Sequence, residues 1–213
     1  MKKIVFVLIG LQLLTFFILF QLYKRVLINE ALYEEAKYQI VVGKYPRVSN
    51  PEQLENAESV VFGEEMAPNN LKVLLSTDCY YCNEFINKYL DTLFQAFVEP
   101  GKINIELIYI GYLDNSYYQL NHISTFYSAG STRDKFSVLN EFHPETETEL
   151  PLPNDKKSEF ARVDSMIVQN RNIAYELNIY QFPTFILNER VIKGLPSLED
   201  FLSILEVELN YAY

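Results

Sequence analysis

The stretch that decides the fold is Leu71–Leu93, which reads LKVLLSTDCYYCNEFINKYLDTL. It begins with an apolar run typical of a buried β-strand, continues into Cys79-Tyr80-Tyr81-Cys82, and then takes the periodicity of a helix. The chain contains 2 cysteines, and both lie at this predicted junction of strand and helix. We therefore expect the chemistry of the protein to be centred there.

A helix N-terminus is a favourable position for a reactive thiol. Its unpaired backbone N–H groups and partial positive charge stabilise a thiolate, so the pKa of a cysteine there falls below the free value of about 8.5. In a Cys-x-x-Cys pair the first sulfur lies at the exposed tip of the helix, and the second lies further inside but within bonding reach. The spacing predicts that Cys79 is the nucleophile and Cys82 the resolving thiol.

Charge and composition limit the classes of function. The chain has 213 residues with 16 Tyr and 15 Phe, enough for one domain with a substantial core. All 28 acidic residues follow Arg25, and the part of the chain after Arg25 carries only 14 basic side chains. Such an acidic body repels phosphates, which argues against nucleic acid as a partner.

Residues 4–23 form an almost continuous apolar segment, long enough as a helix to cross a bilayer core of about 30 Å. A cleaved signal peptide has a shorter apolar core and a small-x-small cleavage site, whereas this segment ends on Leu22-Tyr23-Lys24-Arg25. The pattern favours an uncleaved, single-pass anchor in the bacterial inner membrane. The basic pair Lys2-Lys3 is expected in the cytoplasm, which places the catalytic domain on the periplasmic or extracytoplasmic side.

Three parts are expected along the chain: a transmembrane signal anchor at residues 1–24, a helical stalk and linker at 25–58, and a folded domain at 59–213. The helix of the stalk either lifts the domain off the bilayer or associates with a second copy. Inside the domain, a helical insertion is expected at about 113–178. Apolar runs predict further strands at 60–62, 103–110, 184–187 and 190–192.

The strand leading into Cys79-Tyr80-Tyr81-Cys82, the helix after it, and Phe182-Pro183-Thr184 at the start of a hairpin together resemble the thioredoxin superfamily. The resemblance covers roughly Ser59–Glu208, and the helical insertion before the proline favours the DsbA-like branch. It implies an α/β, thioredoxin-like fold, in which a central mixed sheet is flanked by helices.

The resemblance also implies an activity and its residues. In the family the proline is cis and faces the cysteine pair, so Pro183 joins Cys79 and Cys82 as a catalytic residue. Tyr80, Tyr81, Phe182 and Thr184 are then expected to contact the substrate. The implied function is that of a membrane-anchored protein thiol–disulfide oxidoreductase that needs no cofactor or metal. Its expected partners are client protein thiols or disulfides and a redox-recycling partner.

The sequence departs from the family pattern at three places. The residue before the proline is commonly small, β-branched or Thr in the family, whereas here it is Phe182, which is expected to narrow the substrate groove. Related proteins often keep a buried acid six residues before the first cysteine, and this chain has Val73 there. The internal proton acceptor for Cys82 is therefore missing, or supplied by water or by another group. The pair Tyr80-Tyr81 between the cysteines has neither the Pro nor the His of familiar members, which leaves the direction of electron flow open.

Two alternatives remain open from the sequence. A thioredoxin-like domain can serve as a non-enzymatic adaptor of an envelope complex, with the insertion as its binding surface. A Cys-x-x-Cys pair can also belong to a zinc or copper carrier, which needs further ligands. The 2 histidines of the chain, His122 and His143, are the residues that would supply them.

Overall fold

The computed structural model describes residues 2–64, 66–76, 79–111, 117–131, 134–135, 138–139 and 157–211, without the side chains of residues 2–14 and 117–119. The chain divides into two compact units, residues 1–44 and residues 45–213. Parts of the predicted insertion, including residues 140–156, lie outside the described residues.

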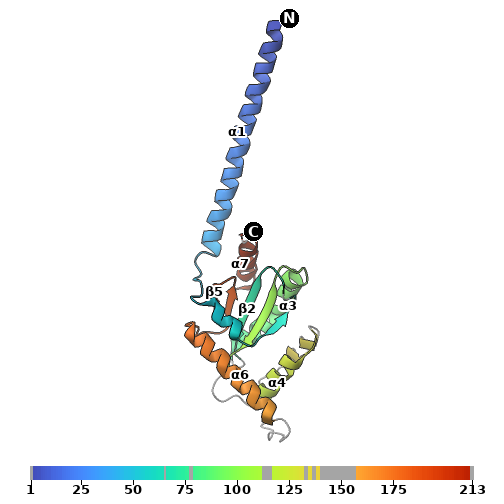
Figure 1. Ribbon diagram of the computed structural model, residues 1–213, viewed down its shortest axis with the longest axis vertical. Coiled ribbons are helices and arrows are strands. Elements are labelled where there is room, and N and C mark those ends of the chain that lie inside the picture. The colour runs from blue at the N-terminus through green and yellow to red at the C-terminus, as the bar shows by residue number, and fades with distance from the viewer. Residues whose placement is uncertain are drawn as a thin grey trace. The chain divides into compact units, whose positions relative to one another are not determined.

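The first unit is a helix, α1 (Lys2–Val41), which joins the predicted anchor and stalk in one continuous element (Figure 1). It ends where the N–H groups of Val42 and Gly43 both donate to the carbonyl of Tyr38, at 2.8 and 3.0 Å. No helix in the described part of the chain is long and apolar enough to cross a membrane. Residues 4–14 of the predicted anchor lie outside the residues whose side chains are described.

The second unit is built on a five-stranded mixed sheet with the order β1-β3-β2-β4-β5 (Figure 1). Strands β2 and β3 are parallel neighbours, and the other three pairings are antiparallel. Each observed strand falls within two residues of its predicted bounds. The strands are β1 (Val60–Phe62), β2 (Asn70–Leu75), β3 (Asn104–Tyr109), β4 (Thr184–Leu187) and β5 (Arg190–Lys193).

Helices connect the strands in the predicted places. Between β2 and β3 lie α2 (Tyr80–Lys88), α3 (Leu90–Leu93) and a turn of π-helix (Phe94–Val98). Between β3 and β4 lie α4 (Tyr117–Ser128) and α6 (Lys157–Glu176). The last helix, α7 (Leu198–Tyr211), follows β5. The sequence predicts a single helix after Cys79, whereas the structure interrupts it at Tyr89. At this break the Tyr89 hydroxyl donates a hydrogen bond of 2.9 Å to the carbonyl of Pro196.

One face of the sheet carries Val73, Leu107 and Phe185, which lie side by side on β2, β3 and β4 and are fully buried. The ring of Phe185 lies 5.0 Å from that of Phe85 on α2 and 4.5 Å from that of Phe201 on α7. Helices α2 and α7 therefore cover this face, and their packing holds the start of α2 next to the end of β2.

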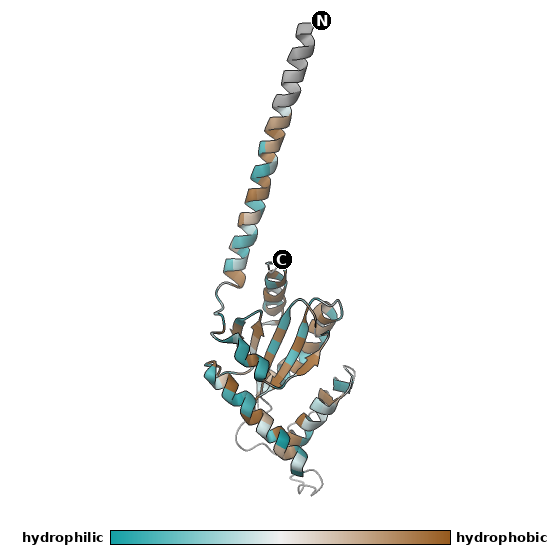
Figure 2. Ribbon diagram, in the orientation of Figure 1, coloured by the Kyte–Doolittle hydropathy of each residue, from teal (hydrophilic) through white to brown (hydrophobic). Residues whose placement is uncertain are grey.

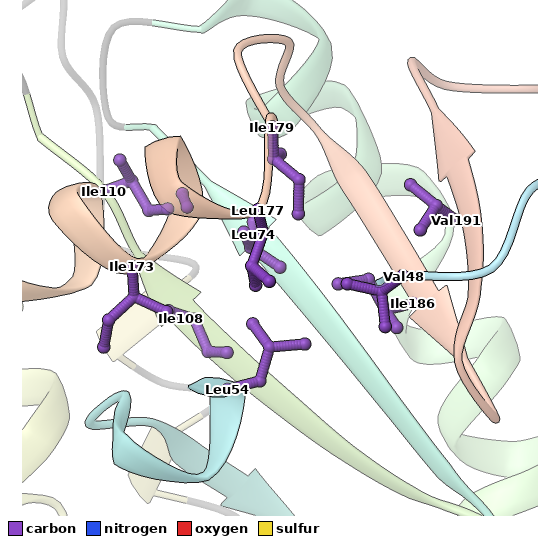
Figure 3. Packing of buried hydrophobic residues seen from close by; sticks show 11 residues of the cluster. Val48, Leu54, Leu74, Ile108, Ile110, Ile173, Leu177, Ile179, Ile186 and Val191 are labelled. Atoms are coloured by element: carbon purple, nitrogen blue, oxygen red, sulfur yellow. The ribbon is translucent and has the colours of Figure 1, made fainter. Parts of the chain in front are cut away.

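The opposite face packs against α6 and a short 3₁₀-helix, η1 (Pro51–Asn56). Figure 2 shows mainly apolar strands and an α6 that alternates between apolar and polar positions, as a helix with one buried side does. Figure 3 shows the buried cluster on this face: Val48, Leu54, Leu74, Ile108, Ile110, Ile173, Ala174, Leu177, Ile179, Ile186 and Val191. Val48 and Leu54 come from the stretch whose sequence predicts a stalk and linker.

Asn170 connects α6 to the sheet through three hydrogen bonds. Its Oδ1 accepts from the N–H of Glu58 at 3.0 Å, and its Nδ2 donates to the carbonyls of Glu58 and Tyr109 at 3.0 and 3.1 Å. The side chain is 1% exposed, so these bonds satisfy polar groups that water does not reach. They join the beginning of β1 and the end of β3 to the middle of α6.

Candidate active site

Cys79 is the N-cap residue of α2. Its backbone is extended, with φ −93° and ψ 112°, and the helix begins at the next residue, Tyr80. The sulfur accepts a hydrogen bond from the backbone N–H of Cys82 at 3.2 Å. The sulfur thus takes the place that a serine or aspartate oxygen takes at other helix starts, where it satisfies an otherwise unpaired donor.

The surroundings of Cys79 favour its ionised form. The pKa of its thiol is lowered to about 7, chiefly because the side chain of Cys82 donates a hydrogen bond to the sulfur. The backbone N–H groups of Cys82 and Tyr81 lower this pKa further, while partial burial opposes them. A substantial fraction of Cys79 is therefore thiolate at neutral pH, and the thiolate is the nucleophilic form of cysteine.

Cys82 has the opposite environment. It is 1% exposed, and burial together with the neighbouring Cys79 raises the pKa of its thiol well above the usual range. Its sulfur accepts the backbone N–H of Ser76 at 3.5 Å. Both cysteines are free thiols in the structure. The pair thus combines one partly exposed thiol that ionises near neutral pH with one buried thiol that stays protonated.

The Phe182–Pro183 peptide bond is cis, as the family resemblance implied. The loop that carries it lies against the cysteine pair, since the sulfur of Cys79 lies 3.3 Å from the carbonyl oxygen of Phe182. Pro183 is buried, and its own carbonyl accepts the N–H of Gly194 at 2.8 Å. The structure therefore brings together Cys79, Cys82 and Pro183, which lie up to 104 positions apart in the sequence.

The residues predicted to contact substrate occupy different positions. Tyr80 and Tyr81 are 71% and 57% exposed, and their rings meet edge to face at 5.4 Å between centroids. Phe182 is partly exposed in the proline loop, and its carbonyl lies near the sulfur of Cys79. Thr184 is fully buried, and its hydroxyl donates to the carbonyl of Gln181 at 2.6 Å. Its side chain therefore hydrogen-bonds within the proline loop and does not reach the surface.

Sequence reasoning missed Ser76, the residue directly after β2. It is 1% exposed, and its hydroxyl oxygen has no hydrogen-bond partner among the described residues. Its backbone N–H is the group that contacts the sulfur of Cys82. The available signal was a serine that ends an apolar strand three residues before the first cysteine. Val73, at the position where a buried acid was sought, is fully enclosed.

No group of three or more His, Cys, Asp or Glu side chains suitable for a metal ion occurs within the described ranges. His122 lies on α4 and is 8% exposed. His143 lies outside the described residues.

Solved structures share this fold at low sequence identity. BdbD from Bacillus subtilis, in its oxidised form, matches with a TM-score of 0.54 at 14% identity, covering 78% of this chain and 97% of that one. The thiol-disulfide exchange protein alpha-DsbA2 from Wolbachia pipientis matches with a TM-score of 0.54 at 15% identity, covering 87% and 98%. The catalytic domain of Proteus mirabilis ScsC matches with a TM-score of 0.51 at 14% identity, covering 76% and 96%. No curated protein sequence matches the chain.

The sequence profile of the thioredoxin family matches residues 55–207. This span contains the whole five-stranded sheet, the cysteine pair at the start of α2 and the cis-proline loop. The chain belongs to the thioredoxin family.

Proposed function

We propose that this protein is a thiol–disulfide oxidoreductase that exchanges disulfides with client proteins through Cys79 and Cys82. The observation that carries the proposal is the asymmetry of the pair. Cys79 is accessible, caps α2 and has a pKa of about 7, whereas Cys82 is buried and stays protonated. Such a pair can form a mixed disulfide at one sulfur and then resolve it with the other.

When the pair is reduced, the Cys79 thiolate attacks a client disulfide. One client sulfur leaves as a thiolate, and a mixed disulfide joins Cys79 to the other. Cys82 then loses its proton and attacks the sulfur of Cys79, which releases the second client thiolate and closes a disulfide between Cys79 and Cys82. The reverse sequence oxidises a client dithiol, and neither direction needs a cofactor.

The exposed side chains around Cys79 supply a surface for the client in this proposal. Tyr80, Tyr81 and the partly exposed Phe182 offer aromatic contacts beside the reactive sulfur. Pro183 shapes the loop that faces the pair. Thr184 supports that loop through its bond to Gln181 and acts on the client only indirectly. The exchange activity named for alpha-DsbA2 agrees with this assignment.

The proposal includes tethering of the domain to the bacterial inner membrane through residues 4–23, on the periplasmic or extracytoplasmic side. Its support is the apolar sequence and the basic pair Lys2-Lys3. A topology reporter fused after Tyr213 is expected to report an extracytoplasmic position. Release of the protein from membranes by salt alone would contradict the anchor.

Trapping of the mixed disulfide tests the exchange reaction. A Cys82→Ser variant keeps the nucleophile but cannot resolve the intermediate, so covalent complexes with clients are expected to accumulate and to disappear on treatment with dithiothreitol. The matched Cys79→Ser variant should form none. If both variants form equally few complexes, or if the doubly substituted Cys79→Ala/Cys82→Ala protein retains full activity in cells, the exchange function is wrong.

The reduction potential of the pair decides the direction of electron flow. Equilibration with glutathione is the measurement, since oxidants of this family have potentials of about −120 mV and reductants of about −270 mV. A value close to either end assigns the protein to that class.

A further inference from the structure

Ser76 contacts the buried sulfur of Cys82 through its backbone and carries a second hydrogen-bond donor in its side chain. Its backbone N–H donates to that sulfur at 3.5 Å. Its hydroxyl is separated from the same nitrogen only by Cα and Cβ, is buried, and has no hydrogen-bond partner among the described residues. A buried hydroxyl without a partner is costly in a folded protein, so this one calls for an explanation.

The exchange reaction has a step at which such a donor is needed. Before reaction, the thiol of Cys82 donates to the sulfur of Cys79, which carries the negative charge. In the mixed disulfide Cys79 has no such charge, and Cys82 must itself become a thiolate in order to attack. Burial opposes this ionisation, because Cys82 is 1% exposed.

Among the described residues, no carboxylate is one of the groups that shift the pKa of Cys82. The position six residues before Cys79 holds the buried Val73. Burial and the neighbouring Cys79 raise the pKa of Cys82, and the N–H of Ser76 lowers it. From the neighbouring strand β3, the phenol of Tyr109 also interacts with Cys82; it is 3% exposed, and burial raises its pKa, so it stays neutral.

We propose that the Ser76 hydroxyl donates a hydrogen bond to the Cys82 sulfur as that sulfur becomes a thiolate, and so acts as a catalytic group in the resolving step. This inference rests on the exchange function proposed above. Rotation about the side-chain torsion of serine among its staggered positions directs the hydroxyl toward or away from the sulfur. The N–H and the hydroxyl of one residue would then stabilise the developing charge in a site that excludes water, where such donors are most effective.

The reagent 5,5′-dithiobis(2-nitrobenzoate) separates the two steps. The Cys79 thiolate attacks the reagent disulfide, forms a mixed disulfide and releases one aryl thiolate. Cys82 then loses its proton to solvent, attacks the sulfur of Cys79 and releases the second aryl thiolate. The first step depends on reagent concentration and the second does not, so stopped-flow absorbance resolves them in the full-length reduced protein.

The test compares Ser76→Ala with Ser124→Ala. Ser124 is also 1% exposed but lies on α4, where its hydroxyl donates to Glu159. In Ser76→Ala the first phase is expected to keep its rate, while the second slows by about tenfold or more and its pH midpoint rises, because a hydrogen bond to a charged group is lost. Ser124→Ala should leave both phases unchanged.

Thermal unfolding separates catalysis from structure. Ser76→Ala removes a buried hydroxyl without a partner, so its melting temperature should equal or exceed that of the unmodified protein. An unchanged second phase in Ser76→Ala overturns the role of Ser76 while the exchange function stands. Equal slowing of both phases together with a lower melting temperature also overturns it. Release of only one aryl thiolate by the unmodified protein refutes the exchange function itself.

Discussion

The sulfur of Cys79 lies 3.3 Å from the carbonyl oxygen of Phe182, although 103 positions separate the two residues. As a thiol, Cys79 donates its proton to this carbonyl, and as a thiolate it accepts hydrogen bonds from Cys82 and from the backbone at the start of α2. The sulfur accepts the N–H of Cys82 in the same structure, so ionisation removes the bond to the proline loop and leaves the bond to the helix start.

Alkylation of Cys79 should follow this ionisation. The thiolate fraction rises as the pH rises through the pKa of about 7, so the rate with iodoacetamide is expected to reach half its maximum near pH 7. Cys82 should stay unmodified in the folded protein because it is buried. Mass spectrometry of peptides after timed reaction distinguishes the two sites, and a midpoint near pH 9 for Cys79 would contradict the proposed environment.

The aromatic pair between the cysteines should affect clients more than small reagents. A Tyr80→Ala/Tyr81→Ala variant loses two exposed rings beside the reactive sulfur, so disulfide exchange with a peptide substrate is expected to slow by about threefold to tenfold. The first phase with 5,5′-dithiobis(2-nitrobenzoate) should stay within about twofold, since the thiolate is unchanged. Tyr211→Ala, at an exposed position on α7, serves as the control and should alter neither rate.

Phe185 should be the main apolar contact that holds α2 and α7 on the sheet. It is fully buried between Phe85 and Phe201, so Phe185→Ala is expected to lower the free energy of unfolding by about 3–5 kcal/mol. Urea unfolding followed by circular dichroism measures this loss. Tyr180→Ala, at a residue that is 65% exposed, should change the free energy by about 0.5 kcal/mol or less. Similar losses in both variants would refute the assignment.

Asn170 should control the attachment of α6 to the sheet. Replacement by alanine leaves the N–H and carbonyl of Glu58 and the carbonyl of Tyr109 without this partner, and is expected to destabilise the fold by about 3 kcal/mol. The amide hydrogen of Glu58 should also exchange faster with deuterium. Ser165→Ala removes only an exposed bond within α6 and should preserve both properties. Unchanged exchange at Glu58 would show that the three bonds do not hold this contact.

The sequence by itself located the strands and the cysteine pair. Apolar runs located all five strands because a strand buried on a sheet needs consecutive or alternating apolar residues. The spacing of Cys79 and Cys82 indicated a thiol at a helix start because this relation is local. The cis state of the bond before Pro183 came from the family resemblance, since only about 5–6% of such bonds are cis in general.

Only the tertiary structure decided which distant residues meet. The bond of Asn170 to Glu58 spans 112 positions, and Val48 and Leu54 enter the core from a stretch whose sequence reads as a linker. Likewise, the N–H of Ser76, directly after β2, meets the sulfur of Cys82 on α2. The local pattern of apolar residues predicts whether a residue is buried. The partner of a buried polar group, however, depends on how separate elements pack. For that reason, the group proposed to assist Cys82 became visible only when β2, α2 and the proline loop were brought together in space.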